Sequence, residues 1–136
     1  MKKFKFIDLF AGIGGFHLSF HSLGAECVYA SEIDEYARKT YELNFKKKSP
    51  KLFQKNLFNK DILNENYSII PNFDILCAGF PCQPFSQAGH KRGFKENYES
   101  RGNMFFAIRD IIKEKKPKAI FLENVRHLIK HDNGNT

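Results

Sequence analysis

The residue with the clearest chemical potential is Cys82, which lies between two prolines in the stretch FDILCAGFPCQPFS, residues 73–86. The apolar run before it is short and ends at Gly79, a pattern typical of an inner strand of a parallel sheet. Pro81 and Pro84 cannot continue the hydrogen-bond ladder, so Cys82 is expected just beyond the carboxyl end of that strand. Ligands bind at that edge of open α/β sheets, which favours nucleophilic chemistry; a small buried hydrophobe is the equally weighted alternative.

A glycine-rich turn follows the first expected strand and opens a helix. It reads FAGIGG, residues 10–15, and Glu32 lies 20 residues after Gly12, at the end of the next expected strand. Glycines let a backbone approach a ligand closely, and an acid at this spacing holds ribose hydroxyls in nucleotide-binding folds. The third glycine of the dinucleotide fingerprint would fall at His17. The pattern therefore favours an adenosine without a pyrophosphate, and S-adenosylmethionine fits; a tight turn with no ligand is the less favoured alternative.

Two carboxylates also follow expected strands. Glu123 follows residues 119–122, on the same sheet edge as Cys82, although a carboxylate that only bonds neighbouring loops is an equal alternative. Asp61 follows a less legible strand and is a weaker candidate. No CxxC or Cys/His cluster is present, so no structural zinc is predicted. The histidines lack paired or triad spacing and are expected on the surface or in the core: His17, His21, His90, His127 and His131.

The elements that must position these residues alternate between strand and helix. Strands are expected at residues 5–10, 27–30, 73–78 and 119–122, and helices at residues 16–23, 35–45, 102–116 and 125–130. This alternation predicts a parallel sheet with right-handed crossovers. Residues 79–101 form a long polar segment, and a loop of that length in a compact domain is typically functional or mobile.

Several details of these elements are open to test. The first helix should end at Gly24, and its buried face is expected to contain Phe16, Phe20 and Leu23. Either Asp34 or Ser31 can cap the second helix. A further strand is expected at residues 52–53 or at residues 57–58. The helix at residues 102–116 is expected to bury one apolar face: Phe105, Ile108, Ile111 and Ile112.

Composition limits the functional classes. The 136 residues suit one modest domain, and 42% hydrophobic residues is ordinary for a globular protein. No apolar run approaches the roughly 20 residues that span a bilayer, and a signal peptide's apolar core is missing, so no membrane association is expected. Three cysteines fit a reducing cytosol. The net charge of +7 favours nucleic acid or another polyanion as the partner, and part of that charge lies in residues 90–95.

Together these motifs resemble the N-terminal part of the DNA (cytosine-5) methyltransferases of the bacterial restriction–modification kind. The matching blocks occur in family order over nearly the whole chain: FIDLFAGIGGF, ASEIDEYA, KDI, DILCAGFPCQPFS, RGNMFF and FLENV. The resemblance implies an α/β, Rossmann-like methyltransferase fold in which helices flank a parallel sheet. It also implies transfer of a methyl group from S-adenosylmethionine to C5 of cytosine in double-stranded DNA.

The resemblance further implies roles for individual residues. The cofactor would be bound by Phe10, Gly12, Gly14, Gly15, Glu32, Ile33, Asp61, Ile62 and Pro81. The substrate would be contacted by Gln83, Ser86, Asn124 and Val125. Cys82 would attack C6 of the cytosine while Glu123, in its protonated form, engages N3, which makes C5 nucleophilic enough to accept the methyl group. The target base must leave the duplex stack, and residues 83–101 would close over it.

The resemblance also has a limit. The chain ends soon after FLENV, where the family continues with further strands, an arginine-bearing block and a target-recognition domain. Residues 1–136 are therefore expected to be the N-terminal part of a catalytic domain with an incomplete sheet. The chain would be a fragment, a truncated gene product or one half of a split enzyme, and in the last case a complementing C-terminal chain would be its partner. Two alternatives remain: a tRNA cytosine-5 methyltransferase that shares these motifs, and a cofactor-binding module without turnover. A thiol hydrolase is disfavoured, because no histidine is placed as a partner for Cys82.

Overall fold

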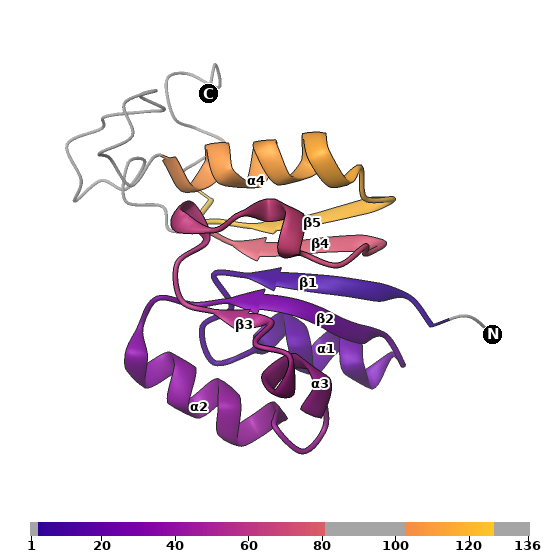
Figure 1. Cartoon of the computed structure of the whole chain (residues 1–136), viewed down its shortest axis with the longest axis vertical. Helices are drawn as coiled ribbons and strands as arrows, with labels where there is room; N and C mark the ends of the chain where they lie inside the picture. The colour runs from indigo at the N-terminus through magenta and orange to yellow at the C-terminus, as the bar shows by residue number, and fades with distance from the viewer. Residues whose placement is uncertain (1–2, 81–102, 127–136) are drawn as a thin grey trace.

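The computed structural model describes residues 3–80 and 103–126, which form a sheet in the order β3-β2-β1-β4-β5 with every pair parallel. The strands are β1 (Lys5–Leu9), β2 (Glu26–Ser31), β3 (Phe58–Asn59), β4 (Ile75–Gly79) and β5 (Ala119–Glu123). The helices are α1 (Gly15–Ser22), α2 (Glu35–Phe45), α3 (Pro50–Gln54) and α4 (Asn103–Lys115), with short 3-10 helices η1 (Ile62–Asn64) and η2 (Tyr67–Ile69). All strand arrows point the same way in Figure 1, so the carboxyl ends share one edge.

The sheet is covered on both faces, because its strands bury alternate residues in two different clusters. On one face, Ile7, Leu9 and Leu76 pack with residues of α4, η1 and η2. On the other face, Phe6 and Cys77 pack with residues of α1, α2 and α3. This three-layer arrangement confirms the predicted α/β, Rossmann-like class, with a parallel sheet and flanking helices.

The predicted helix signals are mostly confirmed. Asp34, rather than Ser31, caps α2, since its Oδ1 accepts a hydrogen bond of 2.8 Å from the backbone N–H of Ala37. Gly24 ends α1 with a φ of +84°, a value that glycine adopts without strain. The expected apolar face of α4 packs into the core through Phe105, Ile108, Ile111 and Ile112.

Three expectations about elements need correction. Leu23 is 81% exposed, because α1 ends at Ser22 and instead buries His17 against the sheet. The further strand lies at Phe58–Asn59, and residues 52–53 belong to α3, whose Leu52 faces the core. Val125 is not helical and Arg126 is in a turn, while the remainder of the expected helix at residues 125–130 lies outside the described residues.

The strand order places a topological switch point between β1 and β4. From β1 the chain winds outward through β2 to β3, and then returns to place β4 on the other side of β1, followed by β5. Crevices outside the carboxyl ends of strands at such a point are where open α/β sheets bind ligands. Every predicted site residue that the structure describes follows or ends one of these strands.

Candidate functional site

The glycine turn after β1 uses its glycines for different physical reasons. Gly14 has a φ of +97°, and a Cβ there would lie 2.1 Å from the Phe45 ring, so only glycine fits between the turn and α2. Gly12 has a φ of +55°, yet a Cβ there would meet no atom within 4 Å among the described residues. Phe10 also has a positive φ, of 55°, which is uncommon for a residue with a side chain. The turn therefore packs closely against α2 at Gly14, whereas at Gly12 no described residue fills the space beside the backbone.

Glu32 connects this turn to the end of β2. Its Oε2 accepts a hydrogen bond of 2.7 Å from the backbone N–H of Gly12, and its Oε1 accepts one of 2.8 Å from the N–H of Asp34. Glu32 and the glycine turn are therefore in direct contact. A carboxylate offers about four acceptor positions, so two remain for a ligand once the contacts with residues 3–80 and 103–126 are counted.

Three more of the residues predicted to bind the cofactor follow β2 and β3: Ile33, Asp61 and Ile62. Asp61 caps η1, where its Oδ1 accepts a hydrogen bond of 3.0 Å from Leu63 N and its Oδ2 one of 2.7 Å from Asn64 Nδ2. The side chain of Ile62 is buried in the core, which leaves only its backbone for a ligand. Ile33, directly after Glu32, is 56% exposed and offers an apolar surface.

At the other end of the sheet edge, β4 and β5 present a second group. Glu123 is paired in register with Gly79, and its Oε2 lies 3.4 Å from the position of a Cβ on that glycine. Asn124 Nδ2 donates a hydrogen bond of 3.0 Å to the carbonyl oxygen of Phe80, and its Oδ1 accepts one of 2.8 Å from Val125 N. Asn124 therefore ties the end of β5 to the residue that leads into the expected nucleophile loop.

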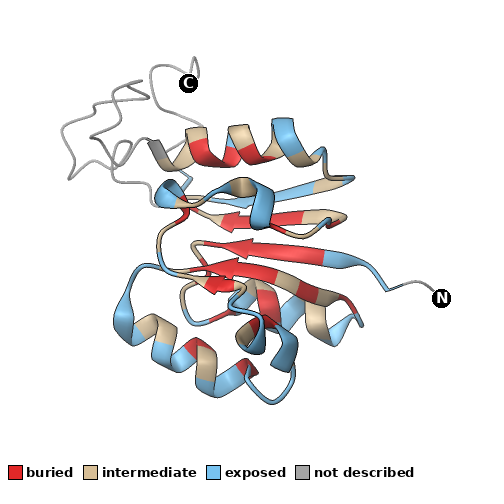
Figure 2. Cartoon of the chain, viewed as in Figure 1, coloured by how far each residue is buried: buried red, intermediate tan, exposed pale blue. Residues whose placement is uncertain are grey.

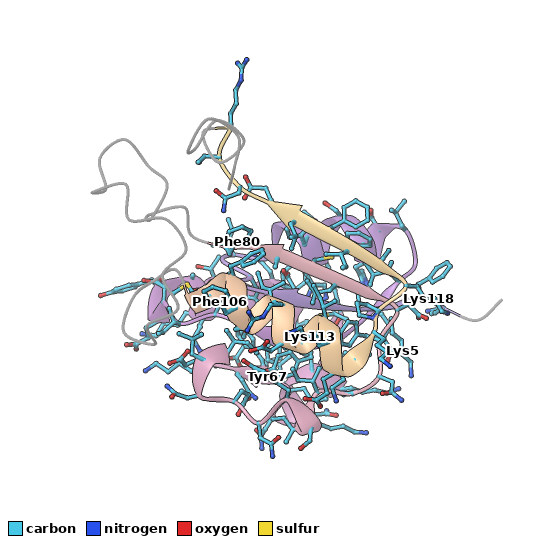
Figure 3. The ribbon with its side chains drawn as sticks, turned by 90° about the horizontal axis from the view of Figure 1, so that it is seen from above. Lys5, Tyr67, Phe80, Phe106, Lys113 and Lys118 are labelled. Carbon is cyan, nitrogen blue, oxygen red and sulfur yellow. The ribbon has the colours of Figure 1, made fainter. Side chains whose placement is uncertain are left out.

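Figure 3 shows Phe80 at the carboxyl end of β4, whereas Lys5 and Lys118 lie at the opposite end of the sheet. At that opposite end, Lys118 Nζ pairs with Asp74 Oδ1 at 2.7 Å. Phe80 itself is buried, with its ring centroid 6.0 Å from that of Phe105 on α4. Phe80, the last described residue before Cys82, is therefore held in position both by α4 and by Asn124.

The remaining cysteines are unsuited to nucleophilic chemistry. Cys27 and Cys77 are free thiols buried in the core. Burial, together with the nearby carboxyl of Asp8, raises the pKa of Cys77 to about 12 and that of Cys27 well above its ordinary value. Neither thiol forms a thiolate at neutral pH, which leaves Cys82 as the candidate. Pro81, Cys82, Gln83 and Ser86 lie outside the described residues, so their roles stay predictions.

Sequence reasoning missed a buried polar group behind the glycine turn. Both ring nitrogens of His17 are hydrogen-bonded, Nδ1 to the hydroxyl of Tyr41 at 2.6 Å and Nε2 to that of Ser49 at 2.9 Å. The ring stacks on Phe45, the residue that also confines Gly14, at a centroid distance of 3.9 Å. The expectation that His17 belongs to the core or surface is correct, but no spacing signal indicated that it supports the turn.

Comparison with known proteins places this arrangement in a family. The model of the C-5 cytosine-specific DNA methylase family matches residues 4–136. The chain is 52% identical over 132 residues to Type II methyltransferase M.HhaI of Haemophilus parahaemolyticus, covering 97% of this chain and 37% of the relative. It is 51% identical over 137 residues to Type II methyltransferase M.HpaII of Haemophilus parainfluenzae, covering 99% of this chain and 35% of the relative.

Solved structures agree on the fold. S. pombe Dnmt2 methyltransferase superimposes with a TM-score of 0.68 at 23% identity, covering 96% of this chain and 39% of that chain. A putative DNA modification methyltransferase encoded within an E. coli prophage gives a TM-score of 0.70 at 26% identity, covering 98% and 35%. The chain thus spans a little over a third of the length of these relatives. With this match over nearly its whole length, the chain belongs to the C-5 cytosine-specific DNA methylase family.

Proposed function

We propose that this chain forms the cofactor-binding and nucleophile-bearing part of a DNA (cytosine-5) methyltransferase of a restriction–modification system. The observation that carries the proposal is the order of residues along one sheet edge. Asp61 follows β3, Glu32 follows β2, the glycine turn follows β1, and Glu123 ends β5. The residues proposed to bind the cofactor thus lie along one half of the edge, and Glu123, proposed to contact the cytosine, lies on the other half. The strand that leads to Cys82, β4, lies between the two groups.

The described residues fit S-adenosylmethionine. Open space above Gly12 admits a ligand close to the backbone, and the unused acceptor positions of Glu32 suit two ribose hydroxyls. Exposed Ile33 offers an apolar contact for adenine. Gly14, the N-cap of α1, has no side chain to cap the first turn, so the helix N-terminus can meet the carboxylate of a methionine moiety. When bound, the cofactor supplies an electrophilic methyl group.

The chain's own residues would activate the base. The thiolate of Cys82 adds to C6 of cytosine, which places electron density on C5. Glu123, protonated as it engages N3, stabilises the charge that develops on the ring. After C5 has been methylated, solvent water takes up its proton, and the electron pair of that C–H bond restores the C5–C6 double bond and expels the sulfur of Cys82 as a thiolate. Asn124 acts on this step indirectly, through its hydrogen bond to the carbonyl of Phe80.

Double-stranded DNA is the proposed substrate. The net charge of +7 favours a polyanion, and the target base must be flipped from the stack to reach a thiol at a sheet edge. Residues 83–101, Gln83 and Ser86 among them, are proposed to close over that base. The relatives are more than twice as long as this chain, and we propose that sequence reading comes from a C-terminal part outside residues 1–136, whether on the same chain or on a complementing one.

The direct test measures transfer of labelled methyl from S-adenosylmethionine by the 136-residue chain, with mixed-sequence duplex DNA and tRNA in parallel. Label on C5 of DNA cytosine is the expected result, and Cys82→Ser should abolish it while leaving cofactor affinity within about twofold. Label on tRNA alone would instead establish the tRNA methyltransferase. Binding of the cofactor with no label on either substrate would identify a module that needs its complementing chain.

The cofactor assignment has its own test. Glu32→Ala should weaken S-adenosylmethionine binding by about 10- to 100-fold, because charge-assisted hydrogen bonds to the ribose are lost. Isothermal titration calorimetry measures this directly. The matched control is Glu35→Ala, which removes an exposed carboxylate that pairs with Lys39 on the same helix. Equal affinities for the two variants would remove Glu32 from the site.

A further inference from the structure

We propose that Arg38 is a positioning residue for the cofactor, because its guanidinium joins the carboxyl ends of β2 and β3 and so sets the spacing between Glu32 and Asp61. The inference rests on the function proposed above. It deepens that function by naming a residue that would control adenosine binding from outside the site.

The guanidinium of Arg38 bonds to backbone rather than to carboxylates. Nη1 donates to the carbonyl oxygens of Glu32 at 3.0 Å and Asn59 at 2.5 Å, and Nη2 donates to that of Phe58 at 3.1 Å. Its Cζ also lies 4.2 Å from the centroid of the Phe58 ring. Within residues 3–80 and 103–126, no carboxylate forms an ion pair with Arg38. Its contribution is therefore geometric, through three carbonyl groups and one ring.

These contacts matter because β3 is very short. It contains two residues, and backbone hydrogen bonds join it to β2 from Ala30 N to Leu57 O at 3.0 Å and from Glu32 N to Asn59 O at 3.1 Å. Asp61 follows this strand by two residues, so its position depends on the pairing. Arg38 adds further bonds at the point where the ladder ends.

Arg38 is itself held by the residues that it positions. It lies one turn into α2, where its N–H donates to the carbonyl of the capping Asp34 at 3.0 Å. The N–H of Asp34 in turn donates to Glu32 Oε1 at 2.8 Å. The side chain of Glu32, the start of α2 and the end of β3 thus form one closed set of contacts. Movement of Arg38 would be transmitted to both carboxylates.

A lysine could not replace this side chain. The guanidinium is a planar fork with five donors, which can reach three carbonyls while its face lies on the Phe58 ring. An ammonium is a compact point charge that reaches fewer of them. Loss of the fork leaves half-buried carbonyls at the strand ends with fewer partners, which loosens the pairing.

The test measures binding of S-adenosylhomocysteine to the full chain by calorimetry, with the free energy of unfolding measured for each variant. Arg38→Met should weaken binding by roughly tenfold, and Arg38→Lys should fall between it and wild type. Lys39→Met is the control for charge, because Lys39 is exposed on the next position of α2. Ile111→Val is the control for stability, because Ile111 packs on the α4 face of the sheet. Both controls should bind like wild type.

A double-mutant cycle separates positioning from simple destabilisation. If Arg38 acts through Glu32, the losses from Arg38→Met and Glu32→Ala should be clearly less than multiplicative. Wild-type affinity in folded Arg38→Met, multiplicative losses, or an equal loss in Ile111→Val would each overturn the inference. Those results would leave the proposed function intact, whereas absence of binding by the wild-type chain would overturn both.

Discussion

At the scale of single residues, burial shifts the pKa values of two side chains, Asp8 and His17, in opposite directions. Asp8 is fully buried in β1, and neither carboxyl oxygen has a hydrogen-bond partner among the described residues. Burial raises its pKa well above 3.8, although the nearby backbone N–H of His17 offsets part of the shift. Burial also lowers the pKa of His17 to about 3, helped by the charges of His21 and Lys48. Folding therefore favours the protonated form of Asp8 and the neutral form of His17.

This pair predicts a characteristic dependence of stability on pH. In the unfolded chain Asp8 releases its proton near pH 3.8 and His17 near pH 6.5. Above pH 3.8 the unfolded chain carries the proton on His17, whereas the raised pKa of Asp8 favours its protonated form in the folded chain, so the two groups contribute to the slope with opposite signs. In Asp8→Asn only the contribution of His17 remains. The unfolding free energy of this variant should rise between about pH 3 and 6.5, by about 1.4 kcal/mol per pH unit.

The complementary substitution should reverse the sign. In His17→Leu only Asp8 remains, and its raised pKa makes the unfolding free energy fall as pH rises above 3.8. Denaturant unfolding followed by circular dichroism over pH 4 to 6.5 measures both slopes. His21→Gln, which leaves both buried groups in place, should keep the wild-type profile, whose slope lies between those of the two variants. Parallel slopes in Asp8→Asn and His17→Leu would contradict the proton assignment.

At the scale of elements, substitutions at two glycines of the turn after β1 should have different effects, one mainly on stability and the other mainly on cofactor binding. Gly14→Ala should lower the unfolding free energy by about 2–4 kcal/mol, because a methyl group would overlap Phe45 at a positive φ. Gly12→Ala should cost only about 1 kcal/mol, because the space around it is open and only the positive φ is strained. Its larger effect should be on S-adenosylmethionine, whose approach the methyl group obstructs.

Urea unfolding and cofactor titration on the same samples separate the two roles. A larger stability loss in Gly12→Ala than in Gly14→Ala would contradict the packing argument. Unchanged cofactor affinity in folded Gly12→Ala would show that the open space is not the binding site. Gly24→Ala is the control, since Gly24 also has a positive φ but lies at the far end of α1.

Sequence signals predicted helix ends correctly where those ends depend only on residues nearby in the chain. The cap at Asp34 and the stop at Gly24 depend on neighbours in the chain, and both are confirmed. The prediction that Leu23 is buried was wrong because helical spacing alone cannot show where a helix ends relative to the sheet. The polar side chain of His17 is buried on this helix instead. The two-residue strand β3 could not be chosen over residues 52–53 from pattern alone. Its pairing depends on tertiary contacts, including those of Arg38.

At the scale of the whole molecule, the strand order explains why distant motifs form one site. Parallel strands bring their carboxyl ends to one edge, so the acids and glycines that follow them converge without being adjacent in the chain. The sequence could therefore predict Glu32 and Glu123 as edge residues. It could not predict the bond from Glu32 to Gly12 N or the link from Asn124 to Phe80, because these depend on register and side-chain direction.

The outer edge of the sheet carries the last prediction. β5 pairs with β4, and within the described residues no strand lies on its other side. Ile120, Phe121 and Leu122 are 44%, 51% and 45% exposed, so both faces of this strand are partly open, and Figure 2 shows the contrast with the buried central strands. We propose that a segment outside residues 1–136 covers this edge in the functional protein. Without it, the exposed strand is a template for pairing with a second copy.

The 136-residue chain should therefore self-associate, and Leu122→Lys should reduce that association because a charge on β5 disfavours edge pairing. Sedimentation velocity over a concentration series measures it. Leu43→Lys is the matched control, because Leu43 is 84% exposed on α2, away from the edge. If the control lowers association as much as Leu122→Lys does, general surface hydrophobicity is the cause. If the edge is responsible, amide hydrogens of Ala119–Glu123 should exchange more slowly as the concentration rises, since pairing protects them.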